Sequence, residues 1–423
     1  MKIAIVGAGI VGVTTAYELA RDGHDTTVFD RRSALAEEAS FATGGLLAPA
    51  VLSSWGAPGA APAPSVWGGA AKLRIGSALT ATDLAWLRRW RQAARAYAQD
   101  PTPQPPLLAL ERLARYSHER LQAMATGLDM AFERSGGALL LLRSAADAAA
   151  LQPVVEALRM AGTVATEVDA ATARTIEPGL SEHTQLAGAL HLPGGEAGNC
   201  RQFALLLRQA AQSLGVQFLF NQTVTRLVCT AQTSAPVSVQ LQGETAPQHF
   251  DAVVLCTGAS AATLLKPLGL RLPLVSLYGS TLSAPLQESI NAPLSAVLDA
   301  RHQVCIVRLG QRVRVSGGAE LGRGQAGNAA HTATLQMLYQ VLSDWFPGGA
   351  QMSGNVQVWR GARAALPDGP PVLGASGVPG LWLNIGHGAS GWGLACGSAR
   401  ALADCVAGRT PDIDLAGMGA GRF

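Results

Sequence analysis

The sequence predicts an α/β fold with two domains, one of which is interrupted by the other. Three observations lead to this prediction. The first 30 residues show the pattern of a strand, a glycine-rich turn, a helix and a second strand. Glycine-rich turns after apolar runs return near residues 256 and 386. Between these turns, from Val275 to Gln340, apolar and polar residues alternate with period two, as in the strands of a mixed sheet.

The first element is the apolar run Lys2–Val6, which is typical of a buried parallel strand. A helix is predicted from Ile10 to Asp22, and a second strand over Thr26–Phe29. A basic residue followed by apolar residues also resembles a secretion signal. The order of strand, glycines, helix and strand argues against that interpretation and indicates a nucleotide-binding βαβ unit.

Three glycines and one acid give this unit its chemistry. Gly7, Gly9 and Gly12 have G-x-G-x-x-G spacing, and Asp30 ends the second strand. In this pattern the first glycine makes the tight turn, the second leaves room for a pyrophosphate, and the third lets helix and strand pack closely. The acid accepts hydrogen bonds from ribose hydroxyls, and the helix N-terminus supplies amide donors to phosphate. The unit is therefore predicted to be Rossmann-like and to bind a dinucleotide.

Composition limits the class of protein. Charged residues make up 14% of the 423 residues, and mean hydropathy is +0.20. The sequence contains no uninterrupted run of about 18 apolar residues, which a membrane-spanning helix would need. The net charge of +3 is spread along the chain, which argues against a nucleic-acid surface. The six cysteines are scattered without a CxxC pair, so neither a disulfide framework nor a metal site is predicted, and a reducing compartment is favoured.

The middle of the chain is predicted to hold a loop, helices and strands. Residues 50–68 are rich in Ala, Pro, Gly and Ser and predict a long loop. The following helix, 82–98, is amphipathic, and core packing is favoured over a membrane or partner surface. Its predicted apolar face comprises Leu84, Leu87, Trp90, Ala94 and Tyr97, with Arg88, Arg89, Arg91 and Arg95 largely elsewhere. Further on, we expect helical structure over 107–134 and 145–161, a strand over 136–142, and two strands around the turn 309–311.

These elements divide into two discontinuous domains. The nucleotide-binding domain is predicted to comprise residues 1–48, 196–262 and 355–423. The substrate-binding domain is predicted to comprise 49–195 and 263–354, with an insertion of loop and helix at about 50–98.

With these pieces in place, the chain resembles the D-amino-acid dehydrogenases of the glycine oxidase and D-amino acid oxidase flavoprotein superfamily. The resemblance runs over nearly the whole chain. The segments that carry it are GAGIVGVTTAYELARDGH, SFATGGLLAP, LPGGEAGNCRQF, VVLCTGAS, GARAALPDGPPVLG and LWLNIGHGASGWG.

The resemblance implies non-covalent FAD and a glutathione-reductase-like FAD-binding domain. The G-x-G-x-x-G pattern alone does not separate FAD from NAD, although Ala16 and the pair Arg31-Arg32 look more like flavoproteins. Glycines ahead of the last helix expose amides that suit negative charge on a reduced flavin. The residues placed at the cofactor by this resemblance are Gly7, Gly9, Ile10, Val11, Gly12, Asp30, Arg31, Arg32, Ser40, Thr43, Gly44, Gly45, Leu46, Val224, Cys256, Thr257, Gly258, Gly361, Arg363, Gly386, His387, Gly388, Ala389, Ser390, Gly391 and Trp392.

Four residues are the predicted catalytic and substrate-contacting set. Arg363 matches the position at which relatives hold the substrate carboxylate, for which a planar guanidinium is suited. Ser280 stands where many relatives place a tyrosine, and Tyr278 lies two positions earlier. His387 invites a general-base role, but a packing and hydrogen-bonding role is favoured because hydride transfer from a neutral amine needs no base at carbon.

The chain departs from the family pattern at several positions, and these leave the substrate open. Thr43 and Leu46 replace amide side chains near the ring, and Ala364 replaces an expected proline.

The predicted function is FAD-dependent oxidative deamination. Hydride would pass from Cα of a D-amino acid, or of a cyclic D-imino acid such as hydroxy-D-proline, to flavin N5. Electrons would leave to a quinone or another carrier. The alternatives are a glycine or sarcosine type oxidase that uses oxygen, and a flavin-binding subunit without turnover. The expected location is cytoplasmic, with a peripheral contact on the inner face of the membrane and a homo-oligomer both left open.

Overall fold

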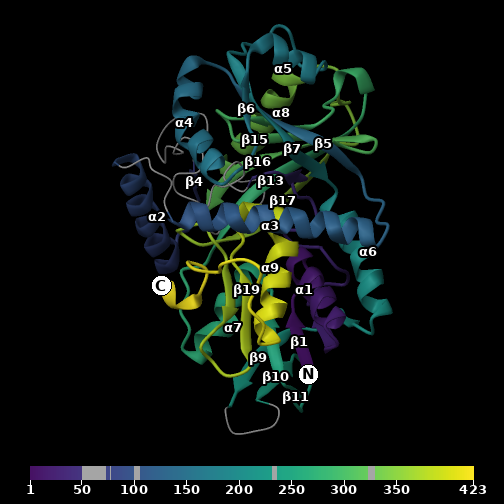
Figure 1. Ribbon diagram of the computed structural model, residues 1–423, viewed down its shortest axis with the longest axis vertical. Coiled ribbons are helices and arrows are strands. Elements are labelled where there is room, and N and C mark those ends of the chain that lie inside the picture. Colours follow the sequence, from purple (N-terminus) through teal and green to yellow (C-terminus); the bar gives the residue numbers. More distant parts are fainter. Residues whose placement is uncertain (50–72, 77, 100–104, 231–235, 323–328) are drawn as a thin grey trace.

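The computed structural model describes residues 1–49, 73–76, 78–99, 105–230, 236–322 and 329–423. The predicted loop at 50–68 lies outside these ranges. Figure 1 shows two lobes stacked along the long axis, with helix α3 (Pro105–Gly127) lying across the middle. The N-terminal βαβ unit is in the lower lobe, and a large sheet forms the upper one. Among the described residues, no helix is both long and apolar enough to span a membrane.

A six-stranded sheet with the order β18-β19-β12-β1-β2-β8 organises the lower lobe. Its strands β19, β12, β1, β2 and β8 run parallel, and β18 is antiparallel. The predicted strand, helix and strand at the N-terminus are confirmed by β1, α1 and β2. The bounds are β1 Lys2–Val6, β2 Asp25–Phe29, β8 Gln217–Leu219, β12 Ala252–Leu255, β18 Val372–Ala375 and β19 Leu381–Ile385.

Both faces of this sheet are covered, which explains its apolar strands. Ile3 and Ile5 pack in one core with helices α1, α6 and α9. Ala4 and Val6 pack in a second core, on the other face of the sheet, with a three-stranded sheet and α7. The helices are α1 Ile10–Arg21, α6 Cys200–Ser213, α7 Ala261–Leu265 and α9 Gly391–Val406, and the three strands are β9 Val224–Cys229, β10 Val237–Leu241 and β11 Gln248–Phe250.

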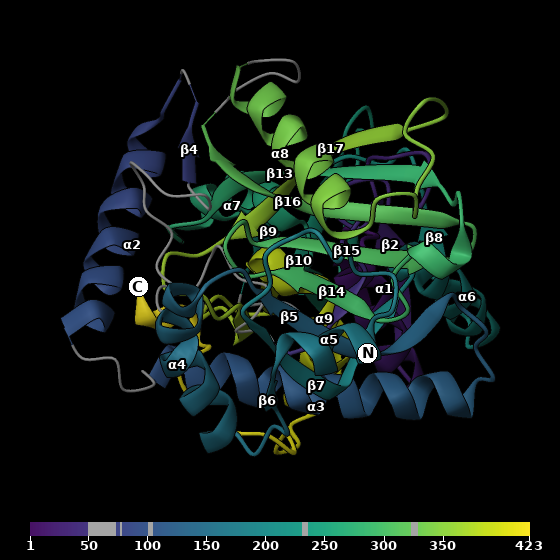
Figure 2. The ribbon, with the colours of Figure 1, turned by 90° about the horizontal axis from the view of Figure 1, so that it is seen from above.

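The upper lobe is built on a ten-stranded mixed sheet, seen from above in Figure 2. Eight strands follow the order β17-β13-β16-β15-β14-β5-β7-β3, while β4 pairs with β16 and β6 pairs with β7. Its strands are β3 Leu46–Leu47, β4 Leu73–Ile75, β5 Arg134–Leu142, β6 Thr166–Val168, β7 Gly188–Gly198, β13 Val275–Pro285, β14 Ala296–Asp299, β15 Val304–Leu309, β16 Arg312–Leu321 and β17 Gln357–Ala365. Its other helices are α4 Ala145–Met160, α5 Ala170–Ile176 and α8 Ala329–Trp345.

The sheet topology differs from part of the predicted organisation. The predicted boundary at residue 355 assigns the following strand to the nucleotide-binding domain, whereas β17 is an edge strand of the ten-stranded sheet. Helix α8 begins inside the region 275–340 that was expected to be strands, because its buried residues recur with helical spacing. The helix expected over 107–134 ends at Gly127, and β5 begins at Arg134.

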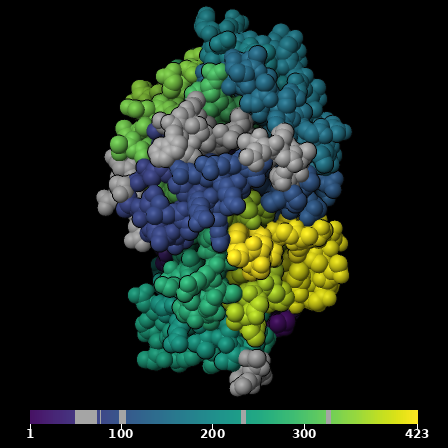
Figure 3. Space-filling view, turned by 90° about the vertical axis from the view of Figure 1, so that its left-hand side faces the viewer, coloured from purple at the N-terminus to yellow at the C-terminus, as the bar shows by residue number. Residues whose placement is uncertain are grey.

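Helix α2 (Ala81–Gln99) is present as predicted, but its buried face is rotated from the predicted one. Trp86 is fully buried and stacks on Trp90, with ring centroids 6.0 Å apart, whereas Leu84 is 55% exposed. The large indole at position 86 fixes the buried face, because burying its area outweighs burying one leucine. Figure 3 shows the side of the molecule on which α2, in dark blue, lies at the surface.

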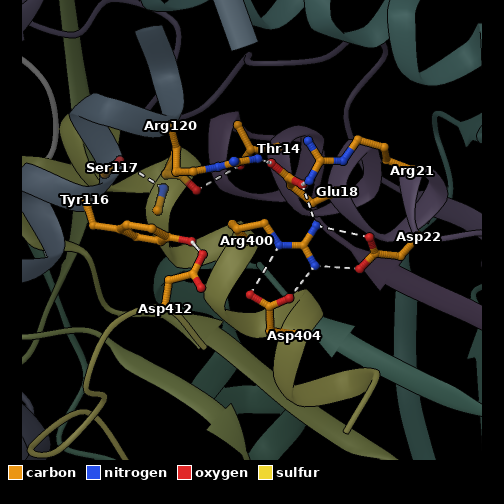
Figure 4. A network of polar contacts seen from close by, with 12 residues as sticks. Thr14, Glu18, Arg21, Asp22, Tyr116, Ser117, Arg120, Arg400, Asp404 and Asp412 are labelled. Carbon is orange, nitrogen blue, oxygen red and sulfur yellow. Dashed lines mark hydrogen bonds and ion pairs between the residues drawn. The ribbon is translucent and has the colours of Figure 1, made fainter. Parts of the chain in front are cut away.

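A buried ionic network joins α1, α3 and α9 (Figure 4). Arg400 on α9 binds Glu18 at 2.7 Å, Asp22 at 2.5 Å and Asp404 at 2.8 Å. Glu18 has no exposed side-chain surface and also binds Arg120 of α3 at 2.9 Å. The network therefore links α3 to α1 and α9, two of the helices that cover one face of the six-stranded sheet.

Candidate active site

A cavity of 1030 Å³ lies between the two sheets. The parallel strands β1, β2, β12 and β19 all end at it, so their carboxyl ends share one edge of the six-stranded sheet. In open α/β sheets this edge is where ligands bind. The other wall comes from β13, β16 and β17 of the ten-stranded sheet.

The glycine-rich turn has the geometry that its spacing predicts. Gly7 has φ +107°, and a Cβ there would lie 2.6 Å from the carbonyl oxygen of Cys256. A Cβ on Gly12 would lie 1.8 Å from the carbonyl oxygen of Gly7. Only glycine fits at these two positions, because a larger residue at Gly7 would clash with the backbone after β12, and one at Gly12 would push helix α1 off the turn. Gly9 lines the cavity with only the Ser40 hydroxyl near it, which leaves the backbone open to a ligand.

Asp30 lies at the end of β2 and lines the same cavity. Its carboxylate accepts hydrogen bonds from the amides of Ala8 at 2.6 Å and Arg32 at 2.8 Å, and burial raises its pKa. Arg31 and Arg32 both bind Glu38, at 2.7 Å and 2.6 Å. Glu38 was not predicted as a site residue. Its carboxylate forms ion pairs with both arginines that follow Asp30.

The loop from Ser40 to Leu46 is held by both lobes. The Ser40 hydroxyl accepts a hydrogen bond from the amide of Ile10 at 3.0 Å. The Thr281 hydroxyl on β13 donates to the carbonyl of Ala42 at 2.8 Å, and Arg314 on β16 donates to the carbonyl of Thr43 at 3.2 Å. The upper sheet thereby fixes a loop that lines the cavity.

The stretch before α9 closes another wall. Gly386 and Gly388 have φ of +84° and +56°, and α9 begins at Gly391. His387 is buried, and its Nε2 lies 3.1 Å from the Ser398 hydroxyl. Burial lowers the pKa of His387 to about 3, so its ring is uncharged at neutral pH.

Arg363 is a partly buried cation at the opposite wall. Its Nη1 donates to the carbonyl of Gly318 at 3.0 Å, and a Cβ at Gly279 would lie 2.1 Å from Nη2, so the guanidinium lies directly over that glycine. Burial lowers the pKa of Arg363 to about 10, still charged at neutral pH. Within the described part of the chain, no carboxylate forms an ion pair with it. A buried charge without a partner is costly, and an anionic ligand would relieve that cost.

Tyr278 and Ser280 do not lie where a shared role with Arg363 would need them. In the β13–β17 ladder Arg363 pairs with Leu277, and Tyr278 pairs with Ala362. Directly paired residues share a face, so Tyr278 and Arg363 project from opposite faces of the sheet. Both line the cavity, which therefore extends around the edge strand β17. Ser280 is fully buried and is not among the lining residues.

The structure brings most of the predicted residues to one cavity. Three of the predicted site residues do not line it, namely Gly12, Ser280 and Ser390. Of these, Gly12 keeps its predicted packing role. Lining residues that the sequence did not reveal include Gln222, Gln303, Ser316, Trp359, Arg360 and Asn384. Trp359 and Arg360 were visible in the segment WRGAR, whereas the other four residues have no distinctive spacing in the sequence.

Comparison with known proteins agrees with this geometry. The family model described as "FAD dependent oxidoreductase" matches residues 2–405. The chain belongs to that family. It is 38% identical to a D-amino acid dehydrogenase of Cereibacter sphaeroides, over 100% of this chain and 95% of the relative. It is 36% identical to a D-amino acid dehydrogenase of Allorhizobium ampelinum, over 100% and 99%.

Solved structures show the same fold at lower identity. Glycine oxidase from Geobacillus kaustophilus has a TM-score of 0.76 at 20% identity, covering 100% of this chain and 98% of that one. L-proline dehydrogenase from P. horikoshii has a TM-score of 0.74 at 15% identity, covering 100% and 97%. The predicted α/β class, with a Rossmann-like sheet and a mixed sheet, is confirmed.

The cavity residues fit the FAD that the family uses. The Thr257 hydroxyl and the Trp392 indole nitrogen both belong to residues that line the cavity, and each is buried without a hydrogen-bond partner among the described residues. Buried polar groups are normally satisfied, so these two atoms are suited to contact a ligand. The open backbone at Gly9 and the carboxylate of Asp30 are suited to the pyrophosphate and ribose contacts expected of a dinucleotide site.

Proposed function

We propose that this enzyme oxidises a D-amino acid to an imino acid, which water then hydrolyses to a 2-oxo acid and ammonia. The proposal is supported by the similarity to two D-amino acid dehydrogenases over the full chain. The single structural observation that carries it is Arg363, a partly buried cation in the cavity without a carboxylate partner among the described residues. An α-amino acid supplies the missing anion.

Arg363 would bind the substrate carboxylate through its planar donor fork. Such charge-assisted pairs are short and directional, and so they fix the orientation of the Cα–H bond. The hydrogen bond from Nη1 to Gly318 fixes the guanidinium in turn. Because burial keeps His387 uncharged, it adds no second cation and leaves the carboxylate to Arg363.

The lower lobe would hold FAD without a covalent bond, and the upper lobe would supply the substrate-facing wall. Bound FAD supplies the acceptor for the hydride that leaves Cα. Gly7, Gly9 and Asp30 would hold the dinucleotide end, and the stretch from Gly386 to Trp392 would lie at the ring. Release of yellow cofactor on acid precipitation tests the non-covalent bond.

The substrate test is anaerobic reduction of the flavin band near ~450 nm, which follows from the cofactor's chemistry. The panel comprises D-amino acids, hydroxy-D-proline, glycine and sarcosine. Arg363→Ala is expected to lower kcat/KM by about 10²- to 10³-fold, because truncating a buried charge partner costs about 2–5 kcal/mol. Arg308→Ala is the matched control, since Arg308 lies on β15 and does not line the cavity.

Three outcomes would contradict parts of this proposal. A yellow protein that no panel member reduces would remove the substrate assignment. Equal losses in the Arg363 and Arg308 variants would remove the role of Arg363. Peroxide release at the rate of turnover in air would replace the quinone or other carrier by oxygen.

We further propose that α2 contacts the inner face of the cytoplasmic membrane, where a quinone acceptor would be available. Arg88, Arg89 and Arg95 are exposed on α2 and have no acidic partner among the described residues, and Leu84 is exposed beside them. Cationic and apolar groups on one helix suit an anionic lipid surface.

Co-sedimentation with vesicles tests this contact. The protein is expected to sediment with phosphatidylglycerol vesicles but not with phosphatidylcholine vesicles, and exchanging the three arginines for glutamate should abolish the sedimentation. Equal sedimentation of native protein and variant would refute this contact.

A further inference from the structure

A second arginine, Arg360, lines the cavity, and its charge is paired with a carboxylate that is buried behind the cavity wall. Arg360 lies on β17, and its guanidinium carbon is 3.9 Å from the ring centroid of Tyr278 on β13. Its Nη2 binds Glu320 of β16 at 2.8 Å. Tyr278 pairs directly with Glu320 in the β13–β16 ladder. The three residues therefore lie on three neighbouring strands, β17, β13 and β16, which run side by side in Figure 2.

The two charges of this row are not equally accessible. Arg360 and Tyr278 line the cavity, whereas Glu320 does not and is 2% exposed. Glu320 also accepts a hydrogen bond from the Thr334 hydroxyl of α8 at 3.3 Å. A ligand would thus meet Arg360 from the cavity side, with the neutralising carboxylate behind it.

Arg360 and Arg363 consequently differ in what they can bind. They lie three residues apart on β17, so their side chains leave opposite faces of the strand, and both line the cavity that extends around it. Arg363 keeps its charge free, while the donors of Arg360 are directed at Glu320 and one face of its guanidinium is covered by Tyr278. Of these two arginines, only Arg363 is without a carboxylate partner in the part of the chain that the structure describes.

We propose that Glu320 determines substrate specificity by neutralising Arg360, so that the cavity accepts one carboxylate at Arg363 and disfavours substrates with an acidic side chain. This inference rests on the proposed function. Glu320 acts through Arg360 and does not touch the substrate, so its role is one of electrostatic positioning.

The expected size follows from Coulomb's law. A second free cation about 10 Å from a substrate carboxylate, at an effective dielectric constant of about 20, changes relative binding by about tenfold. Glu320→Gln keeps the shape of the side chain and removes its charge. The variant should therefore favour an acidic substrate over its neutral isostere.

The experiment compares D-glutamate with D-glutamine, which differ in charge but hardly in shape. The ratio of their kcat/KM values is measured by anaerobic flavin reduction in the native enzyme, Glu320→Gln, Arg360→Gln and the double variant. We expect the ratio to rise about tenfold in Glu320→Gln. It should fall in Arg360→Gln, where Glu320 stands alone, and return near the native value in the double variant.

A binding measurement separates this inference from the proposed function. Succinate and butyrate are titrated against the oxidised flavin spectrum of each variant, which needs no turnover. If no D-amino acid reduces the native flavin but Glu320→Gln binds succinate about tenfold better relative to butyrate, the proposed function fails and the role of Glu320 stands.

Two results would overturn the inference alone. One is a native enzyme that oxidises D-glutamate as efficiently as D-glutamine. The other is a ratio that stays unchanged in Glu320→Gln or, if that variant does not fold, in Arg360→Gln and the double variant. Flavin content and melting temperature identify variants that have lost the fold.

Discussion

Replacing Arg400 with methionine is expected to destabilise the protein by about 3 kcal/mol. The Arg400 side chain is 5% exposed and binds Glu18, Asp22 and Asp404 at 2.5–2.8 Å. Methionine keeps much of the apolar stem, so the loss comes from the charge and not from a large cavity. Three carboxylates would then share fewer cations in a region of low dielectric constant.

The remaining contacts set the magnitude. Removing one partner of a buried ion pair typically costs about 3–5 kcal/mol. The lower end applies here because Arg120 still binds Glu18, and Arg409 still binds both Asp22 and Asp404. Unfolding entropies of about 2.1 cal/mol/K per residue convert this into a decrease in melting temperature of about 3 °C for 423 residues.

The assay is thermal unfolding of the flavin-loaded protein at 0.1 M and 1 M NaCl. Arg159→Met is the matched control, because Arg159 also binds a carboxylate on its own helix but is 72% exposed. The control should melt with the native protein. The Arg400 decrease should persist in 1 M salt, since buried pairs are screened little. Equal melting temperatures for the two variants, or a decrease that vanishes in high salt, would refute the reasoning.

Two further predictions concern glycine packing and acid stability. Gly12→Ala is expected to abolish flavin binding, because its Cβ would lie 1.8 Å from the Gly7 oxygen. The control Gly393→Ala in α9 should retain flavin, because a Cβ there meets nothing within 4 Å. The flavin content per protein is measured for both variants, and retention of flavin in Gly12→Ala would contradict the packing argument. Burial lowers the pKa of His387 in the folded protein to about 3, against 6.5 in the unfolded chain. As the pH falls below 6.5, the unfolded chain therefore binds a proton that the folded protein does not, and the free energy of unfolding decreases. The loss of unfolding free energy from pH 7 to pH 5, measured by urea titration, should be about 2 kcal/mol smaller in His387→Asn than in the native protein, and equal losses would show that His387 is protonated in the fold.

Local patterns in the sequence predicted the lower lobe well. The spacing of Gly7, Gly9 and Gly12 implies a tight turn, and the close approach of Gly12 to the Gly7 carbonyl, which involves two residues of the same motif, confirms it. Arg363 was likewise found through its segment, and it lines the cavity.

Long-range register was beyond the sequence. The opposite faces of Tyr278 and Arg363 depend on how β13 pairs with β17, and the partner of Arg360 is Glu320, which lies 40 residues earlier in the chain. Nothing in the spacing of single residues reveals such pairing, because a shift of one residue reverses the face of every side chain. The buried face of α2 was misjudged for a related reason, since only tertiary contacts select Trp86 over Leu84.

The strand order of the six-stranded sheet has a consequence for biosynthesis. Strand β1 lies between β2, which follows it closely, and β12, which begins at Ala252. A ribosome adding about 5–20 residues per second therefore exposes one edge of β1 for more than ten seconds before its second neighbour emerges. Helix α9, which packs on α1, follows later still. A nascent chain would display an apolar, unpaired strand during this interval, which makes it a candidate client for chaperones and leaves cofactor capture to the last stage of folding.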